Sequence, residues 1–214
     1  MGDGFLAIWS DIGPEHETDY LHWMTREHAI ERVSLPGFLA MRMFRTVGIE
    51  VLRYFILYEL ENAGVVGTPD YLARLNQPTA WTQRIMPKVS NFVRGGGRVE
   101  EISRAAQGGF LAVLPLGAAG IADAKRAVPA VTKADRIAAA RLLVTDHGQT
   151  SIQTREKGMR AGDSSFDALL LIEGLDAAAV RGAIAGLAAP LLAAAMPPGP
   201  AVYETIFALD RRSL

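Results

Sequence analysis

One short pattern occurs twice in this chain, and it restricts the fold more than any other feature of the sequence. Residues 4–8 read GFLAI, and residues 109–113 read GFLAV. Two further apolar segments recur in the same order: MRMF at 41–44 matches ARLL at 140–143, and YFILYE at 54–59 matches ALLLIE at 168–173. Because these short likenesses keep a common order, the sequence indicates two copies of one supersecondary unit.

Both copies are predicted to contain a strand, a helix, two strands, a helix and a strand. In the first copy, apolar runs predict strands at 4–9, 37–45, 51–60 and 91–104, the last of them bulged at glycines 95–97. Its helices are predicted at 19–35, ended by Pro36-Gly37, and at 78–89, after a helical turn at 70–75. The second copy is predicted to have strands at 109–113, 140–143, 168–173 and 201–209 and helices at 118–133 and 176–195.

This element order is the ferredoxin-like βαββαβ arrangement. We therefore expect an α+β protein in which two ferredoxin-like repeats, residues 1–105 and 106–214, pack their sheets face to face as one intrachain dimeric-type α/β barrel. The first helix of the second repeat, residues 118–133, contains no histidine, tryptophan or glutamate and is interrupted by Pro129. A polar active pocket is therefore expected in the first repeat, and the second is expected to be a degenerate scaffold.

Composition excludes several classes of function. The 214 residues include no cysteine, which excludes disulfides, thiolate nucleophiles and cysteine-bound metals and leads us to expect a cytoplasmic protein. The formal net charge of −1 indicates no nucleic-acid partner and no acidic-membrane partner. Asp3 and Asp11 break the apolar start, so no signal peptide is expected. The apolar residues 182–196 are fewer than the roughly 20 that span a bilayer, so no membrane anchor is expected.

The predicted helix at 19–35 carries the clearest functional signal. At about 100° per residue, one of its faces combines apolar residues with two acids near the middle and a histidine at the edge: Tyr20, Trp23, Met24, Ile30, Glu27, Glu31 and His28. Ala29 and Val33 are predicted to point elsewhere, and Arg32 is predicted to lie near the opposite boundary. Burying an unpaired charge costs roughly several kcal/mol, so acids on such a face need ion-pair partners or a wet cavity.

His28 is the leading candidate for a general acid–base, because an imidazole pKa near 6.5 lets small changes in environment set its protonation near neutrality. Glu31, three residues on, or Glu27, one helical turn above Glu31, is expected to orient it or share its proton. Arg42 and Arg53, which lie in apolar strands, are candidates for binding a substrate carboxylate or stabilising an enolate. The alternative is that these arginines only neutralise Glu27, Glu31 and Glu59.

Aromatic residues are candidates for a substrate-binding wall suited to a flat, partly apolar ligand: Tyr20, Trp23, Tyr54, Tyr58 and Trp81. The alternative for each is an ordinary core position. The glycines at 95–97 precede neither a Lys-Ser pair nor a helix, and no nucleophile elbow or dinucleotide fingerprint occurs. His22 points away from His28 and Glu31 on the helical wheel, so no metal site and no cofactor are expected.

The first repeat resembles a known family, the EthD-like branch of the dimeric α/β-barrel superfamily. The likeness rests on Trp23 and His28 with four residues between them, on Pro36-Gly37-Phe38, on residues 54–59 and on PTAWT at 78–82. It covers residues 4–105. The resemblance implies a pocket between the first helix and the sheet, with His28 as the site residue. This chain departs from single-copy members because it fuses two copies and lacks a second histidine-bearing helix.

The superfamily includes cofactor-independent isomerases, polyketide cyclases, decarboxylases, dehydratases, small monooxygenases and haem enzymes. We therefore expect a cofactor-independent lyase or isomerase that acts by proton transfer, with dehydration, decarboxylation or cyclisation as its outcome, on a small aromatic or polyketide-like substrate. Two alternatives stay open: a small monooxygenase, either cofactor-free or with haem, and a non-catalytic binder of a hydrophobic metabolite. Further association into a homodimer also stays open.

Overall fold

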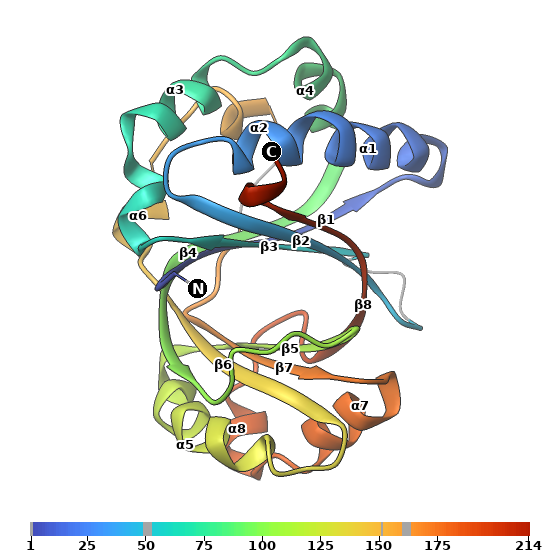
Figure 1. The fold of residues 1–214 in the computed structure, drawn as a ribbon, viewed down its shortest axis with the longest axis vertical. Helices are drawn as coiled ribbons and strands as arrows, with labels where there is room; N and C mark the ends of the chain where they lie inside the picture. The colour runs from blue at the N-terminus through green and yellow to red at the C-terminus, as the bar shows by residue number, and fades with distance from the viewer. Residues whose placement is uncertain (1, 49–52, 151, 160–163) are drawn as a thin grey trace.

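Eight antiparallel strands form a closed barrel with helices on its outside (Figure 1). The structure, a computed structural model, describes residues 2–48, 53–150, 152–159 and 164–214. The strands are β1 Gly4–Ile12, β2 Phe38–Thr46, β3 Tyr54–Leu60, β4 Val89–Ile102, β5 Phe110–Leu116, β6 Ile137–Thr145, β7 Ala168–Gly174 and β8 Ala201–Asp210. The α-helices are α1 Glu17–Trp23, α2 Ala29–Val33, α3 Pro69–Asn76, α4 Ala80–Ile85, α5 Ile121–Val131, α6 His147–Thr150, α7 Ala177–Ala185 and α8 Ala189–Ala193.

The barrel is built from two four-stranded halves. Around the barrel the strands run β1-β3-β2-β8-β5-β7-β6-β4, so the first half has the order β4-β1-β3-β2 and the second half has the order β8-β5-β7-β6. The halves join where β2 pairs with β8 and β4 pairs with β6. Helices α1 to α4 cover the outer face of the first half, and α5, α7 and α8 cover that of the second (Figure 1). The predicted fold class is confirmed; the sequence duplication itself stays a prediction.

Strand periodicity divides the apolar residues into three layers. Alternate residues of a strand point to opposite faces, so on β1 the side chains of Phe5, Ala7 and Trp9 pack inside the barrel while Leu6 packs outside it. Interior side chains from both halves fill the barrel, which is therefore a packed core. Trp9 Nε1 donates a hydrogen bond of 2.8 Å to the Tyr203 hydroxyl across this interior and so ties the two halves together.

Charged residues in the apolar strands pair across the two halves. Arg42 on β2 donates to both carboxylate oxygens of Glu173 on β7, at 2.9 and 2.7 Å. Arg141 on β6 donates to Glu59 on β3 at 3.0 Å and lies 3.6 Å from Glu173. The sequence had suggested Glu27 or Glu31 as partners for Arg42. That suggestion is wrong, because Arg42 points into the barrel while both of those acids lie on the helix outside it.

The predicted first helix contains a feature that the sequence analysis did not anticipate. Helices α1 and α2 are joined by a π-helical turn, Met24–His28. A π-turn adds a residue to the helical repeat, so positions after it are rotated relative to a regular wheel. Ile30, predicted on the apolar face, is 40% exposed, whereas Ala29 and Val33, predicted to point elsewhere, are buried. Arg32, predicted near the opposite boundary, is buried as well.

Other element boundaries follow local chemistry. The predicted helix at 78–89 forms α4 and a 3-10 turn, Met86–Lys88, before β4 begins at Val89. The predicted helix at 176–195 divides into α7 and α8, with Pro190 in the first turn of α8, where proline is tolerated. Residues 51 and 52 of the predicted third strand and residues 49 and 50 of the preceding connection lie outside the described residues.

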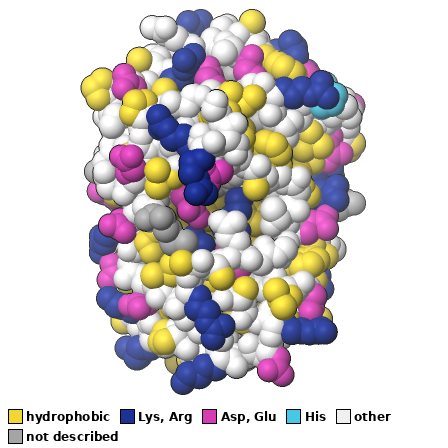
Figure 2. Space-filling view, in the orientation of Figure 1, with side chains coloured by type: hydrophobic (Ala, Val, Ile, Leu, Met, Phe, Trp, Pro, Cys, Tyr) yellow, Lys and Arg dark blue, Asp and Glu magenta, His cyan; other side chains and the backbone are white. Residues whose placement is uncertain are grey.

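The surface carries both signs of charge. On the face seen in Figure 2, basic and acidic side chains are interspersed, without a broad field of one sign. This distribution agrees with the formal net charge of −1. Within the described residues, every helix falls short of the length and apolarity that crossing a bilayer requires.

Candidate active site

Two adjoining cavities lie on the outer face of the first half, between the sheet and the helix formed by α1, the π-turn and α2. Their linings share five residues: Ile8, His28, Tyr58, Phe92 and Glu156. Each offers about 30 Å³ of free volume, comparable to the space of one water molecule. The cavity lined by 15 residues, Arg32 among them, is here called the larger, and the one lined by 12 the smaller. Both are narrow, and a substrate-sized ligand requires their walls to move apart.

His28 is the imidazole that lines these cavities. It ends the π-turn, is only 6% exposed and lines both cavities. Its ring centroid lies 4.3 Å from that of Trp23, which lines the smaller cavity. His16 lies 3.7 Å from Glu15, and His147 contacts Asp167 at 2.8 Å, both on the protein surface.

Tyr58 supplies a neutral hydroxyl to the same cavities. It projects from β3, is almost fully buried and packs edge-on against Phe38 at 5.6 Å. Among the described residues, its hydroxyl has no hydrogen-bond partner. Burial raises the pKa of the Tyr58 phenol, so the group stays protonated and is available to donate a hydrogen bond to a ligand.

Arg32 is a buried cation at the edge of the larger cavity. It is 3% exposed, and its guanidinium donates to Glu156 at 2.5 Å and to Glu31 at 3.3 Å. The Tyr71 ring lies beneath it, 5.9 Å from the guanidinium carbon. Burial opposes the charge on Arg32, but Glu156, Tyr71 and the other neighbouring groups outweigh it and hold the pKa above the ordinary arginine value.

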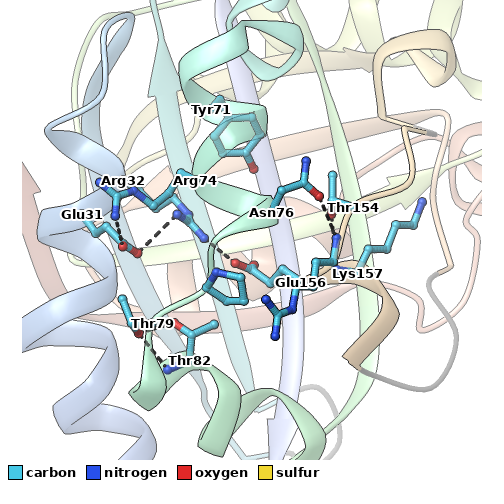
Figure 3. Close-up of polar contacts among 12 residues, drawn as sticks. Glu31, Arg32, Tyr71, Arg74, Asn76, Thr79, Thr82, Thr154, Glu156 and Lys157 are labelled. Atoms are coloured by element: carbon cyan, nitrogen blue, oxygen red, sulfur yellow. Dashed lines mark hydrogen bonds and ion pairs between the residues drawn. The ribbon is translucent and has the colours of Figure 1, made fainter.

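A segment of the second half closes the larger cavity. Residues 152–159, the crossing segment, come from the connection between β6 and β7 and lie against α3 of the first half (Figure 3). The Glu156 amide donates to Leu75 O at 3.0 Å, and the Arg155 amide donates to Asn76 Oδ1 at 3.0 Å. The segment contributes Ile152, Thr154, Glu156 and Lys157 to the lining. The second half therefore helps to build a cavity that lies on the first half.

The two predicted acidic partners of His28 are engaged elsewhere. Glu27 accepts a 2.6 Å hydrogen bond from the Thr79 hydroxyl. Glu31 accepts from Arg32 and, at 2.9 Å, from Arg74 (Figure 3). Burial raises the pKa of Glu31, an effect that Arg32 and Arg74 oppose. The arginines that neutralise Glu31 thus come from helices, whereas the alternative interpretation of the sequence had placed them on the sheet. Neither acid lines a cavity.

The predicted aromatic wall is divided between cavity and scaffold. Tyr20 and Trp23 line the smaller cavity, where the Tyr20 hydroxyl is 2.8 Å from Ser10 Oγ. Tyr54 lies outside both linings and donates its hydroxyl proton to Glu17. Trp81 also lies outside them and donates to Asp19 at 2.9 Å.

Arg53 belongs to the same peripheral network as Tyr54. It forms a 3.0 Å ion pair with Glu17 at the start of α1 and lines neither cavity. Arg42, inside the barrel, is also outside both linings. Of the titratable and charged residues that the sequence analysis proposed as catalytic, His28 alone lines the cavities. The other charged lining residues were not selected: Arg32, Arg94, Glu156 and Lys157.

A second, larger groove lies on the outside of the second half. It has a volume of about 770 Å³ and runs between α5 and the helices α7 and α8, lined mainly by small apolar residues. Its charged lining residues are Asp123, Arg126 and Asp135, and the first two are paired with each other. The residues that line this groove include no imidazole and no phenol.

A metal ion and a haem make different demands on these residues. Within the described residues, no three His, Asp or Glu side chains converge in a way that could hold a metal ion. A haem needs a flat cavity of porphyrin size beside an axial ligand. At about 30 Å³, the two cavities beside His28 have no room for that ring. The residues present therefore do not fit a haem in this conformation.

Comparisons with known proteins give likenesses of structure. No family model and no curated protein matches the sequence. An anthrone oxidase-like protein superposes with a TM-score of 0.62 and 12% identity, over 97% of this chain and 92% of that one. A candidate monooxygenase from Fusobacterium nucleatum superposes with a TM-score of 0.55 and 10% identity, over 98% of this chain and 95% of that one. A mutant chlorite dismutase from Candidatus Nitrospira defluvii superposes with a TM-score of 0.57 and 8% identity, over 97% of this chain and 93% of that one.

At these identities the likenesses establish architecture and no activity. They extend over nearly the whole of each chain, so both halves of the barrel are shared. The chain has the dimeric α/β-barrel fold, closed within a single polypeptide.

Proposed function

We propose that this protein is a cofactor-independent enzyme that moves a proton on a small, flat, enolisable aromatic or polyketide-like substrate. The observation that carries the proposal is the position of His28, a buried imidazole that lines both cavities beside the neutral Tyr58 hydroxyl. The resemblance of residues 4–105 to the EthD-like branch, read as one copy of a tandem repeat, supports the same residue.

The proposed chemistry has two steps. Neutral His28 removes a proton from a carbon next to a carbonyl, and the resulting charge moves onto the carbonyl oxygen. Tyr58 donates its proton in a hydrogen bond to that oxygen, which stabilises the enolate. The Trp23 ring, 4.3 Å from the imidazole, stabilises the imidazolium that forms. Return of the proton at another atom completes an isomerisation, and loss of a β-hydroxyl as water, with the proton supplied by the imidazolium, completes a dehydration. In a decarboxylation the enolate forms instead by loss of carbon dioxide from a β-keto acid, and protonated His28 then delivers a proton to the carbon.

A second candidate is a cofactor-free monooxygenase. The structural likeness to an anthrone oxidase-like protein and to a candidate monooxygenase favours it. The same His28-generated carbanion would transfer its electrons to dioxygen and form a carbon–oxygen bond. The hydroperoxide would then lose water and leave a carbonyl, so the substrate itself would supply the electrons. The first proton transfer is common to both candidates.

The proposal is tested by hydrogen–deuterium exchange at carbon. Anthrone and 2-indanone, two neutral enolisable ketones, are incubated with the protein in D₂O under nitrogen and followed by NMR. We expect the wild-type protein to accelerate exchange and His28→Gln to lose about 10²-fold or more of that acceleration. His22→Gln, on the same helix and outside both linings, is the matched control and should retain wild-type exchange.

Wild-type rates in His28→Gln, with its fold intact by circular dichroism, would remove His28 from the chemistry. Saturable binding of both ketones without acceleration would instead identify a non-catalytic binder. Oxygen uptake on admission of air, dependent on His28, would select the monooxygenase.

A further inference from the structure

The ion pair between Arg32 and Glu156 joins residues from opposite halves of the barrel. Arg32 lies on α2, which packs over the sheet of the first half, and Glu156 lies on the crossing segment. Both side chains are less than a tenth exposed. Removing two charges from water is costly, and a buried pair of this kind gives little net stability compared with apolar residues of the same size. Stability alone therefore gives no reason to bring a carboxylate into this cavity.

The lining of the larger cavity is rich in positive charge. It contains Arg32, Arg94 and Lys157 but a single carboxylate, that of Glu156. Arg94 also donates to the Tyr71 hydroxyl at 3.2 Å, which holds its guanidinium beside the cavity. Without the Glu156 carboxylate, the residues of this lining would include three basic side chains and no acidic one. Such a cavity is suited to a ligand that carries a negative charge.

The remaining walls are suited to an aromatic ring. Tyr71 lies beneath the Arg32 guanidinium, and Phe92, Leu75 and Tyr58 complete the apolar part of the lining. A flat ring among these side chains would place an attached carboxylate on Arg32. It would also place the ring close to His28, which lines the same cavity.

We propose that Arg32 is the anion-recognition residue of this site and that Glu156 is an internal carboxylate which occupies the ligand's position until a small aromatic carboxylate displaces it. The inference deepens the proposed function, since it names the class of ligand for the same cavity. Exchange of one carboxylate for another leaves the charge around Arg32 unchanged, so the buried guanidinium stays paired throughout. Departure of Glu156 also removes one wall of a cavity that is otherwise too small for a ring.

The test is to delete the internal carboxylate and supply an external one. Glu156→Ala creates room and leaves Arg32 with only its longer, 3.3 Å contact to Glu31, so sodium benzoate should bind the variant at least about tenfold more tightly than it binds wild type. The benzoate-induced rise in melting temperature should likewise be larger in the variant. Benzamide, with the same shape and no charge, should have little effect on either protein. Ionic strength is held constant with sodium chloride.

Two variants separate ligand recognition from a structural tether. Glu31→Gln removes the other carboxylate from Arg32, but Glu31 lies outside the cavity lining, so this matched control should show no gain in benzoate affinity. The double variant Arg32→Gln/Glu156→Ala should lose the gain. If Glu156→Ala is too unstable to purify, Glu156→Gln keeps the size of the side chain, and its melting temperature should still respond to benzoate more than wild type does.

The inference is overturned if benzoate binds wild type, Glu156→Ala and Glu156→Gln equally, or if benzamide reproduces the effect of benzoate. It is also overturned if the gain survives loss of Arg32. Failure here is distinct from failure of proton transfer, because benzoate has no enolisable proton and the ketones used above carry no charge.

Discussion

Ion pairs between single residues connect the two halves of the barrel. Arg42 and Arg141 each lie in an apolar strand of one half and pair with a glutamate of the other, Glu173 and Glu59. The four side chains form a buried chain of alternating charge. Loss of one member leaves an uncompensated charge, and loss of a whole pair does not.

This difference is measurable by urea denaturation. Glu173→Gln should lower the free energy of unfolding by about 3–5 kcal/mol, because Arg42 and Arg141 both face the lost carboxylate. The double variant Arg42→Met/Glu173→Leu should be destabilised by less than the sum of its single variants. Additive losses would show that the two side chains act independently and would contradict the pairing.

A second residue-scale effect concerns acid stability. The Tyr54 hydroxyl first, and Arg53 after it, lower the pKa of Glu17 below its ordinary value of 4.5 and outweigh a smaller opposing effect of burial. A lowered pKa in the folded state stabilises the protein at pH values above 4.5, and that contribution disappears as the pH falls through the folded-state pKa. Glu17→Gln should therefore show a shallower loss of stability between about pH 5 and pH 3.

The expected difference is about 1 kcal/mol or less, because Glu17 is partly exposed and solvent screens its partners. It is measured by urea denaturation at a series of pH values. Glu15→Gln, an exposed neighbour, is the control. If wild type and Glu17→Gln lost the same free energy of unfolding between about pH 5 and pH 3, the lowered pKa of Glu17 would be contradicted.

Residue chemistry also explains which part of the site the sequence could predict. Tyr20, Trp23, His28 and Tyr58 were selected by type and pattern, and all four line a cavity. Arg32 was placed near the opposite boundary and given no role, because a regular wheel cannot represent a π-turn. Glu156 was not selected because its role depends on a long-range contact with the first half, and nothing in its local sequence signals that contact.

At the scale of elements, the π-turn determines which side chains face the sheet. It places His28 and Arg32 inward, whereas Arg26, within the turn, is exposed. Deletion of Arg26 should convert the turn to regular helix and rotate the residues after it by about 100°. His28 and Arg32 would then leave the cavities.

The expected result is a loss of several kcal/mol, roughly the cost of displacing buried charged and apolar residues together, and loss of the Trp23–His28 ring contact. Urea denaturation and tryptophan fluorescence measure these changes. Arg26→Ala keeps the chain length and should stay within about 0.5 kcal/mol of wild type. Equal stability of the deletion variant would show that the π-turn has no role in setting the register.

Element order was predictable for a related reason. Strands and helices follow from hydrophobic period and turn residues, which are local properties. The connection between β6 and β7 has no such period, and its packing against α3 is set by single contacts such as that of the Glu156 amide with Leu75 O. The order of strands and helices in the barrel could therefore be predicted from the sequence. The packing of the crossing segment beside the larger cavity could not.

At the scale of the whole molecule, the two halves present matching edges. The first half ends in β2 and β4, which pair with β8 and β6 of the second. Residues 1–105 alone would leave these edges and the inner apolar face uncovered. Because Glu59 stands in the first half where Glu173 stands in the second, a second copy of residues 1–105 could offer Glu59 to Arg42.

We therefore expect the isolated segment 1–105 to form a homodimer, and to give way to a heterodimer when residues 106–214 are added. Analytical ultracentrifugation of each segment and of the mixture measures this. A stable monomer of residues 1–105 would contradict the view that the halves are interdependent layers of one barrel.

The central claim is that the first half holds a ligand site at His28 and Arg32. It is tested most directly by NMR of protein with ¹⁵N-labelled histidine, titrated with benzoate at constant ionic strength and with His28 assigned from His28→Gln. Of the four histidines, we expect the ring signals of His28 to shift saturably while those of His16, His22 and His147 stay fixed. An unchanged His28, with shifts confined to the surface histidines or absent altogether, would contradict the account.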